Sequence, residues 1–178
     1  MASRSLRPCV ATATSERAPV QAFRTLRDPV HFLAFGFGAG LAPRAPGTFG
    51  SLVGLVAAWW LLDLPMLWRI GIVVAVIGAG IWICGESARR LGRHDDQRIV
   101  LDEIAGVLLT ALVVPEKSVF ALLLVFVFFR VFYIVKPWPI RDVDHSLRGG
   151  LGIMLDDLIA ALYAAVCVAT IRVLLPTI

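Results

Sequence analysis

The sequence predicts an all-α protein that crosses a membrane several times, with its long loops on one face. Three observations support this prediction. Of the 178 residues, 58% are apolar and 17% are charged, whereas a soluble domain is about 45–50% apolar and about 25% charged. The mean hydropathy is +0.82. The apolar residues form long stretches with clusters of Lys and Arg between them, which is the pattern of membrane topology rather than of nucleic-acid binding.

The first 28 residues differ from the rest of the chain. They hold five Arg residues against two acidic residues, with many Ser, Thr and Ala residues. Transit peptides have this composition, and so do disordered tails. Because no apolar face repeats here, we predict a disordered basic tail over residues 1–28 and a single helical membrane domain over residues 29–178.

Five apolar stretches follow the tail and predict about five membrane helices. A spanning helix needs about 20 residues. The first stretch is short and contains glycines, so it is tilted, re-entrant, or joined to the next by the turn at 63–65. The stretches cover residues 49–64, 67–84, 99–115, 118–135 and 153–175.

The positive charges assign sides to these stretches. Thirteen of the seventeen Lys and Arg residues precede the first stretch or lie in the loops before the third and fifth stretches. Arg69, Lys117 and Arg172 lie on the other side, and Arg130 is inside the fourth stretch. The positive-inside rule therefore places the two long loops in the cytoplasm, provided that all five stretches cross.

Acidic residues gather on the same predicted face. Asp102 and Glu103 are near the start of the third stretch, and Asp156 and Asp157 are near the start of the fifth. Carboxylate oxygens are ligands that Mg²⁺ prefers. Adjacent acids on a helix point about 100° apart, so we expect one of each pair to bind a metal while its neighbour orients a ligand or carries a proton. Capping of the helix start is the alternative role.

Cations and glycines on this face could bind phosphate. Lys136 and Arg148 could hold phosphate oxygens, and Gly47 and Thr48 could offer backbone N–H groups. A metal with phosphate-binding groups at a membrane edge indicates phosphoryl chemistry on a lipid headgroup. Each group has another interpretation: Lys136 as an interfacial anchor, Arg130 as a snorkelling or acid-paired residue, and the glycines as helix-packing residues.

Four segments resemble the phosphatidylglycerophosphatase A family, in order from about residue 35 to residue 165. They read GAGLAPRAPGTFGSL, HDDQRIVLDEIAG, FRVFYIVKPWPIRDVD and RGGLGIMLDDLIAALYA. The resemblance implies a helical, Mg²⁺-dependent phosphatase of the bacterial inner membrane with its site facing the cytoplasm. Such an enzyme removes the terminal phosphate of phosphatidylglycerophosphate to give phosphatidylglycerol.

The same resemblance assigns site residues. It implies metal ligands at Asp95, Asp102, Glu103, Asp156 and Asp157, of which the last four, with Lys136, are also expected to be catalytic. It implies substrate-binding residues at Pro46, Gly47, Thr48, Lys136, Asp144 and Arg148. Whether an acid activates water or attacks phosphorus directly is left open, as are the number of metals and the oligomeric state.

One position departs from the family pattern. The pattern resembles FRxxDxxKPWPI, and Tyr133 stands where it has Asp. A phenol with a pKa of about 10 is a poor Mg²⁺ ligand near neutral pH. The chain is then a divergent active enzyme, a pseudoenzyme, or a protein with a disabling substitution, and we expect it to bind substrate better than it hydrolyses it.

Three other functions remain as alternatives. One is a non-catalytic lipid-binding membrane protein, which would not need Mg²⁺. Another is a small ion-coupled transporter component, but its acids should lie near the middle of the spans, and here they lie at one edge. The third is a phosphatase that acts on a different lipid phosphate.

Overall fold

A computed structural model of the chain describes residues 27–93, 96–138 and 149–174. Every regular element in these ranges is helical, which confirms the predicted all-α class. The elements are the short helix α2 (Pro29–Ala34), the 3-10 helix η1 (Gly36–Leu41), and the longer helices α3 (Pro46–Leu61), α4 (Met66–Leu91), α5 (Leu101–Ala111), α6 (Val119–Val135) and α8 (Gly150–Leu174).

The five longer helices coincide with the five apolar stretches, and local sequence signals set several of their ends. Pro46 opens α3, a position where the missing N–H of proline costs no helical hydrogen bond. The Ser118 side chain accepts a hydrogen bond from the Ala121 N–H and caps α6. Gly92 ends α4 in the left-handed conformation, with φ of 66°.

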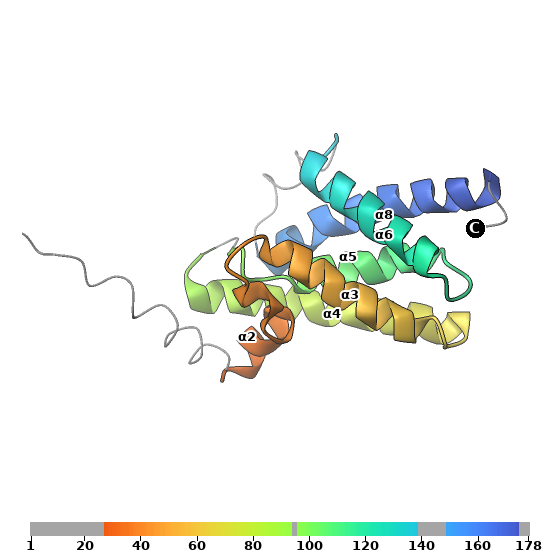
Figure 1. Ribbon diagram of the computed structural model, residues 1–178. Helices are drawn as coiled ribbons and strands as arrows, with labels where there is room; N and C mark the ends of the chain where they lie inside the picture. Colours follow the sequence, from red (N-terminus) through yellow and green to blue (C-terminus); the bar gives the residue numbers. More distant parts are fainter. Residues whose placement is uncertain (1–26, 94–95, 139–148, 175–178) are drawn as a thin grey trace, which may run out of the picture.

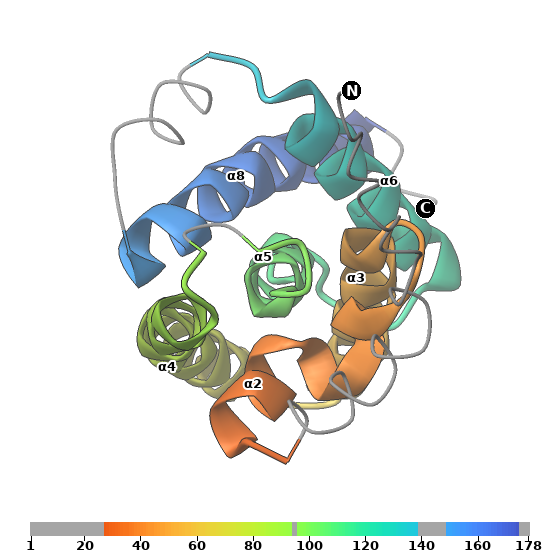
Figure 2. The ribbon, with the colours of Figure 1, turned by 90° about the vertical axis from the view of Figure 1, so that its left-hand side faces the viewer.

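Helix α5 lies in the centre of the bundle. Figure 2 shows it enclosed by α3, α4, α6, α8 and the short α2. Nine of its eleven residues are buried. At 1.5 Å per residue its length is about 16 Å, roughly half of the ~30 Å hydrocarbon core of a bilayer. The apolar stretch 99–115 therefore forms a core helix that is too short to cross a membrane.

Two helices, α4 and α8, are long and apolar enough to cross a membrane, whereas α3 and α6 have 16 and 17 residues. Helix α4 exposes large apolar side chains, among them Leu67, Trp68 and Trp82, and so large an apolar surface is suited to lipid contact. These observations support a membrane protein. They do not support the predicted count of about five full spans.

Glycines allow the helices to approach closely. A Cβ atom added at Gly150 of α8 would lie 1.8 Å from the Ile81 carbonyl oxygen of α4, and one added at Gly106 of α5 would lie 2.4 Å from the Phe129 ring of α6. One added at Gly50 would lie 2.6 Å from the Val100 Cβ atom. The glycines of the first apolar stretch thus let α3 pack against α5 and its preceding residue.

The longer helices alternate in direction, so the molecule has two distinct ends (Figure 1). At one end α3, α5 and α8 begin and α4 and α6 finish; we call this the acidic end. The turns α3–α4 and α5–α6 lie at the opposite end, which we call the far end. The starts of α5 and α8, which carry the acidic pairs, are therefore neighbours in space, as the sequence predicted.

Candidate active site

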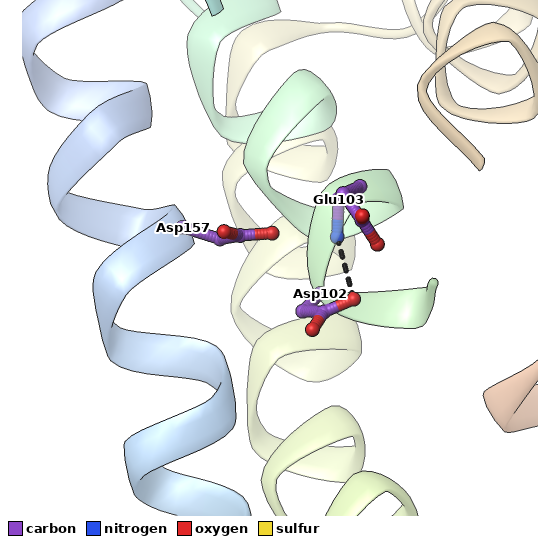
Figure 3. Close-up of side chains that lie close together, drawn as sticks. All are labelled: Asp102, Glu103 and Asp157. Carbon is purple, nitrogen blue, oxygen red and sulfur yellow. Dashed lines mark hydrogen bonds between the residues drawn. The ribbon is translucent and has the colours of Figure 1, made fainter. Parts of the chain in front are cut away.

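Three carboxylates meet at the acidic end. Asp102 and Glu103 lie in the first turn of α5, and Asp157 lies about two turns into α8 (Figure 3). One oxygen from each residue lies within 4.8 Å of the others. All three residues are buried, with 9%, 3% and 2% of their surfaces exposed. The packing of α5 against α8 thus turns two separate acidic motifs into one cluster.

Two oxygens of this cluster have no hydrogen-bond partner. They are Glu103 Oε2 and Asp157 Oδ2, each fully shielded from solvent by the described residues. Asp102 Oδ1 accepts a hydrogen bond from the Glu103 N–H at 3.0 Å. A buried carboxylate without a partner is costly unless a cation or a proton compensates it. Three converging hard oxygens are a donor set that fits a divalent cation.

The two acidic pairs behave differently. In α8 the side chains diverge: Asp157 joins the cluster, whereas Asp156 Oδ2 accepts a hydrogen bond from Lys136 Nζ at 2.8 Å. In α5 both Asp102 and Glu103 reach the cluster. The expectation that one acid of each pair would face the metal position matches α8 and does not match α5.

A polar cavity of about 340 Å³ opens beside the cluster. It lies between the start of α3, the start of α5 and the last turns of α6. Its lining residues are Ala45, Pro46, Gly47, Gln97, Ile99, Asp102, Glu103, Arg130 and Tyr133. Helix starts leave backbone N–H groups without helical partners, and of the α3 residues that line this space Gly47 has such a group, whereas Pro46 has no N–H.

The first-loop residues divide between lining and structural positions. Pro46 and Gly47 line the cavity, as expected for substrate-binding residues. A Cβ atom added at Gly47 would lie 2.2 Å from Glu103 Oε1, so glycine is needed for this approach. The Thr48 N–H donates to the Ala45 carbonyl at 2.9 Å and is thereby engaged, which argues against the predicted phosphate contact through this group.

Tyr133 lines the same cavity. Its ring lies 6.1 Å from the Phe129 ring between centroids, and the guanidinium carbon of Arg130 lies 4.6 Å from its ring centroid. Its hydroxyl faces the Glu103 carboxylate. Position 133 therefore borders the acids, and the tyrosine offers a hydroxyl there rather than a carboxylate.

Three predicted site residues, Asp95, Asp144 and Arg148, lie outside the described residues. The adjacent residue Asp96 is held by Arg98, with two contacts of 2.7 Å between the carboxylate and the guanidinium. This hydrogen-bonded Arg98 lowers the pKa of Asp96 below its usual value.

The segment before α5 is fixed against α2, because the Val100 N–H donates a hydrogen bond to the Ala34 carbonyl at 2.9 Å.

Sequence reasoning missed Arg130 and Gln97 as cavity residues. Arg130 was expected to snorkel or to pair with an acid, but it lines the cavity and makes no ion pair with a described residue. A signal was present, because Arg130 is a cation inside an apolar helix and precedes Tyr133 by three residues, which places both on one helical face. Gln97 gave no such signal.

The fold and the site define an apolar helical protein with an acidic, enzyme-like centre at one end of its bundle. The Phosphatidylglycerophosphatase A family matches residues 32–172. The Phosphatidylglycerophosphatase A of Escherichia coli strain K12 is 38% identical over 142 residues, covering 79% of this chain and 81% of that protein. The protein of the same name from Haemophilus influenzae is 40% identical over 154 residues, covering 83% of this chain and 91% of that protein.

The chain therefore belongs to the phosphatidylglycerophosphatase A family and is a phosphatase, which confirms the resemblance seen in the sequence. A protein of Bacteroides thetaiotaomicron, named for a provisional phosphatidylinositol-3-phosphatase activity, is 36% identical over 144 residues. That match covers 77% of this chain and 89% of the relative. No solved structure matches the chain.

Proposed function

We propose that this protein hydrolyses the terminal phosphate monoester of phosphatidylglycerophosphate and releases phosphatidylglycerol and phosphate. The observation that carries the proposal is the buried cluster of Asp102, Glu103 and Asp157 beside a polar cavity. Membership of the family supports the choice of substrate, because both relatives at 38% and 40% identity carry the name of this activity.

Asp102, Glu103 and Asp157 would hold a Mg²⁺ ion. The unpartnered oxygens of Glu103 and Asp157 support this assignment, because a cation would compensate charges that the described residues leave unpaired. When bound, Mg²⁺ would neutralise phosphate charge and polarise its oxygens. The carboxylates would hold the ion, and one of them would accept the proton of the attacking water or attack phosphorus itself.

The sequence predicted that Lys136 binds phosphate, whereas this proposal gives Lys136 a different role. Its ammonium donates to Asp156 at 2.8 Å, and it ends α6 in a left-handed conformation with φ of 43°. This ion pair joins the end of α6 to α8 beside Asp157. It also neutralises the acid of the α8 pair that does not enter the cluster, so we assign Lys136 and Asp156 a positioning role.

The proposed setting is a bacterial inner membrane, with several helices embedded and the acidic end facing the cytoplasm. The excess of Lys and Arg in the segments of this end supports the orientation. The site would then lie where the headgroup of a membrane lipid is found. The lipid would not need to leave the bilayer for its terminal phosphate to reach the cavity.

Tyr133 is expected to limit turnover. Its neutral hydroxyl replaces a charge beside Glu103, so the centre attracts a divalent cation less strongly than a site with a fourth carboxylate would. We therefore propose that the chain binds its substrate better than it hydrolyses it.

Phosphate release from phosphatidylglycerophosphate in detergent micelles tests both statements. It is measured with Mg²⁺ and with chelator, on the chain and on Tyr133→Asp. Mg²⁺-dependent release that rises strongly in Tyr133→Asp supports both the activity and the role of position 133. Equal release from the two proteins supports the activity and refutes that role. Phosphate release from neither protein, in folded samples, refutes the proposed activity and favours a lipid-binding function.

A different lipid phosphate is the second candidate, because a relative is named for phosphatidylinositol 3-phosphate chemistry. The same carboxylate cluster would serve either monoester. Parallel assays on the two lipids distinguish the candidates: faster release from the inositol lipid would overturn the proposed substrate and keep the chemistry.

A further inference from the structure

Arg130 is a half-buried cation that the proposed chemistry has not yet used. It lies near the end of α6, whose other residues from Val119 to Val135 are apolar apart from the Tyr133 hydroxyl. Its Nη1 atom is buried and has no hydrogen-bond partner among the described residues. An arginine within an apolar helix, with one of its donors buried and unsatisfied, is costly and usually functional. We therefore expect the positive charge of Arg130 to have a function that offsets this cost.

Three other cations among the described residues near the acidic end pair with acids of the chain. Lys136 contacts Asp156 at 2.8 Å, and Arg98 contacts Asp96 at 2.7 Å. Arg90 contacts Glu86 at 2.7 Å. Arg130 is the one cation among the described residues that line the cavity. An anion entering the cavity would meet this guanidinium.

Two neighbours set the position of the Arg130 guanidinium beside the cavity: one contacts it, and the other leaves space for it. The Tyr133 ring lies 4.6 Å from the Arg130 guanidinium carbon, a cation–π contact within one helical turn. Gly47 leaves room on the other side, because a Cβ atom there would lie 3.3 Å from Arg130 Nη1 and 2.2 Å from Glu103 Oε1. The guanidinium, the acid and the start of α3 thus border one common space.

A simple ion pair with Glu103 does not explain this arrangement. The described residues show no ion pair between the two, and each keeps a buried atom without a hydrogen-bond partner: Arg130 Nη1 and Glu103 Oε2. A ligand that carries both charges would satisfy both atoms. A phosphate dianion with its counter-cation is such a ligand, since an arginine fork matches phosphate oxygens and carboxylates match the cation.

We infer that Arg130, together with the backbone N–H of Gly47 at the start of α3, binds the phosphate group that is cleaved. This inference rests on the proposed phosphatase function and adds the residue that recognises its phosphate. Tyr133 is a positioning residue here, because its ring supports the guanidinium. The same site would take free inorganic phosphate, the reaction product, and a lipid phosphate monoester.

The test uses inorganic phosphate, the reaction product, as a probe with Mg²⁺ present and without lipid, so that it does not depend on turnover. Binding to the whole protein in detergent is measured by calorimetry for the unchanged chain, Arg130→Met and Arg130→Lys. Arg89→Met is the matched control: it removes the same charge from the same end, but Arg89 pairs with Glu86 on an exposed surface. The thermal midpoint is recorded for each variant, as is the KM for the lipid wherever turnover is measurable.

We expect Arg130→Met to weaken phosphate binding by about 10- to 100-fold, the range for losing hydrogen bonds to a charged group. Arg130→Lys should recover part of this loss, because it keeps the charge and loses the fork. Arg89→Met should change binding little. The thermal midpoint of Arg130→Met should change little, because Nη1 has no hydrogen-bond partner among the described residues and the contact with Tyr133 is a weak cation–π interaction, whereas loss of a purely structural arginine would lower it.

Unchanged phosphate binding in Arg130→Met would overturn the inference, even if the lipid is still hydrolysed. A lower thermal midpoint in Arg130→Met with unchanged phosphate affinity would show a structural residue and would also overturn it. Weakened phosphate binding in a chain that hydrolyses no lipid would leave the inference standing and refute the proposed activity. The two failures are therefore distinguishable.

Discussion

The two ends of the helical bundle treat buried charge in opposite ways. At the far end the Arg69 guanidinium is buried and donates to four backbone carbonyls, those of Leu62, Leu64, Val114 and Pro115, at 2.7 to 3.0 Å. These carbonyls follow the ends of α3 and α5, where helices leave acceptors without partners. The Arg69 side chain thus caps the ends of two helices, and most of its N–H donors are hydrogen-bonded within the chain.

At the acidic end the buried charges remain partly unpaired. The described residues contain four buried side-chain N or O atoms without a partner, and three of them are here: Glu103 Oε2, Asp157 Oδ2 and Arg130 Nη1. The fourth is Arg172 Nε at the far end, although Arg172 Nη1 donates to the Val113 carbonyl at 3.1 Å. The contrast teaches that the Arg69 charge at the far end is satisfied by hydrogen bonds within the fold, whereas the described residues leave charge at the acidic end partly unpaired.

Asp157→Asn gives the largest expected effect on function. It keeps the size of the side chain and removes one charge from the cluster. We expect phosphate release, in the chain or in Tyr133→Asp, to fall by about 100-fold or more, because even outer partners of metal ligands cost about 10–100-fold. The thermal midpoint without Mg²⁺ should stay or rise, since an unpaired buried charge is lost.

Asp63→Asn at the far end is the control for this experiment. Asp63 pairs with Lys117 at 2.6 Å on a partly exposed surface, so its loss should leave turnover unchanged and cost at most about 1 kcal/mol of stability. Full Mg²⁺-dependent activity in folded Asp157→Asn would break the comparison, because the carboxylate cluster would then have no function.

Arg69→Met should lower stability and leave activity unchanged, which is the opposite of the result expected for Asp157→Asn. Four carbonyls would lose their donor in a buried place, so the free energy of unfolding should fall by about 3 kcal/mol or more. Activity per folded molecule should change little. Thermal unfolding in detergent and a Mg²⁺-dependent assay at low temperature measure the two effects. A stable but inactive Arg69→Met protein would show that the far end also serves the reaction.

Gly47→Ala should give the smallest effect and sharpen the boundary of the site. The added methyl group would displace the end of the Glu103 side chain, which is flexible, so we expect activity to fall about 10-fold with little loss of stability. Gly78→Ala is the control, because a Cβ atom there meets nothing within 4 Å and alanine favours the helix by about 1 kcal/mol. Equal activity in both variants would remove Gly47 from the site.

The sequence predicted the helices and the gathering of acids, because apolar length and helix direction decide both. It did not predict that α5 is a core helix, since an apolar stretch looks the same whether protein or lipid surrounds it. The pairing of Lys136 with Asp156 depends on the rotation of α6 against α8, which the sequence does not encode locally. The role of Arg130 required the start of α3 to approach it, and the absence of a side chain at Gly47 allows this approach.

In the proposed membrane setting, the central position of α5 would separate most of the acidic cluster from the bilayer. Two of the three clustered carboxylates stand on a helix of which nine residues in eleven are buried by other parts of the protein. Bilayers that are thicker or thinner act on the outer helices by changing their tilt. Asp102 and Glu103 belong to an inner element that other helices surround, so in the proposed membrane setting the spacing of these two carboxylates can stay constant while the outer helices adapt to bilayers of changing thickness.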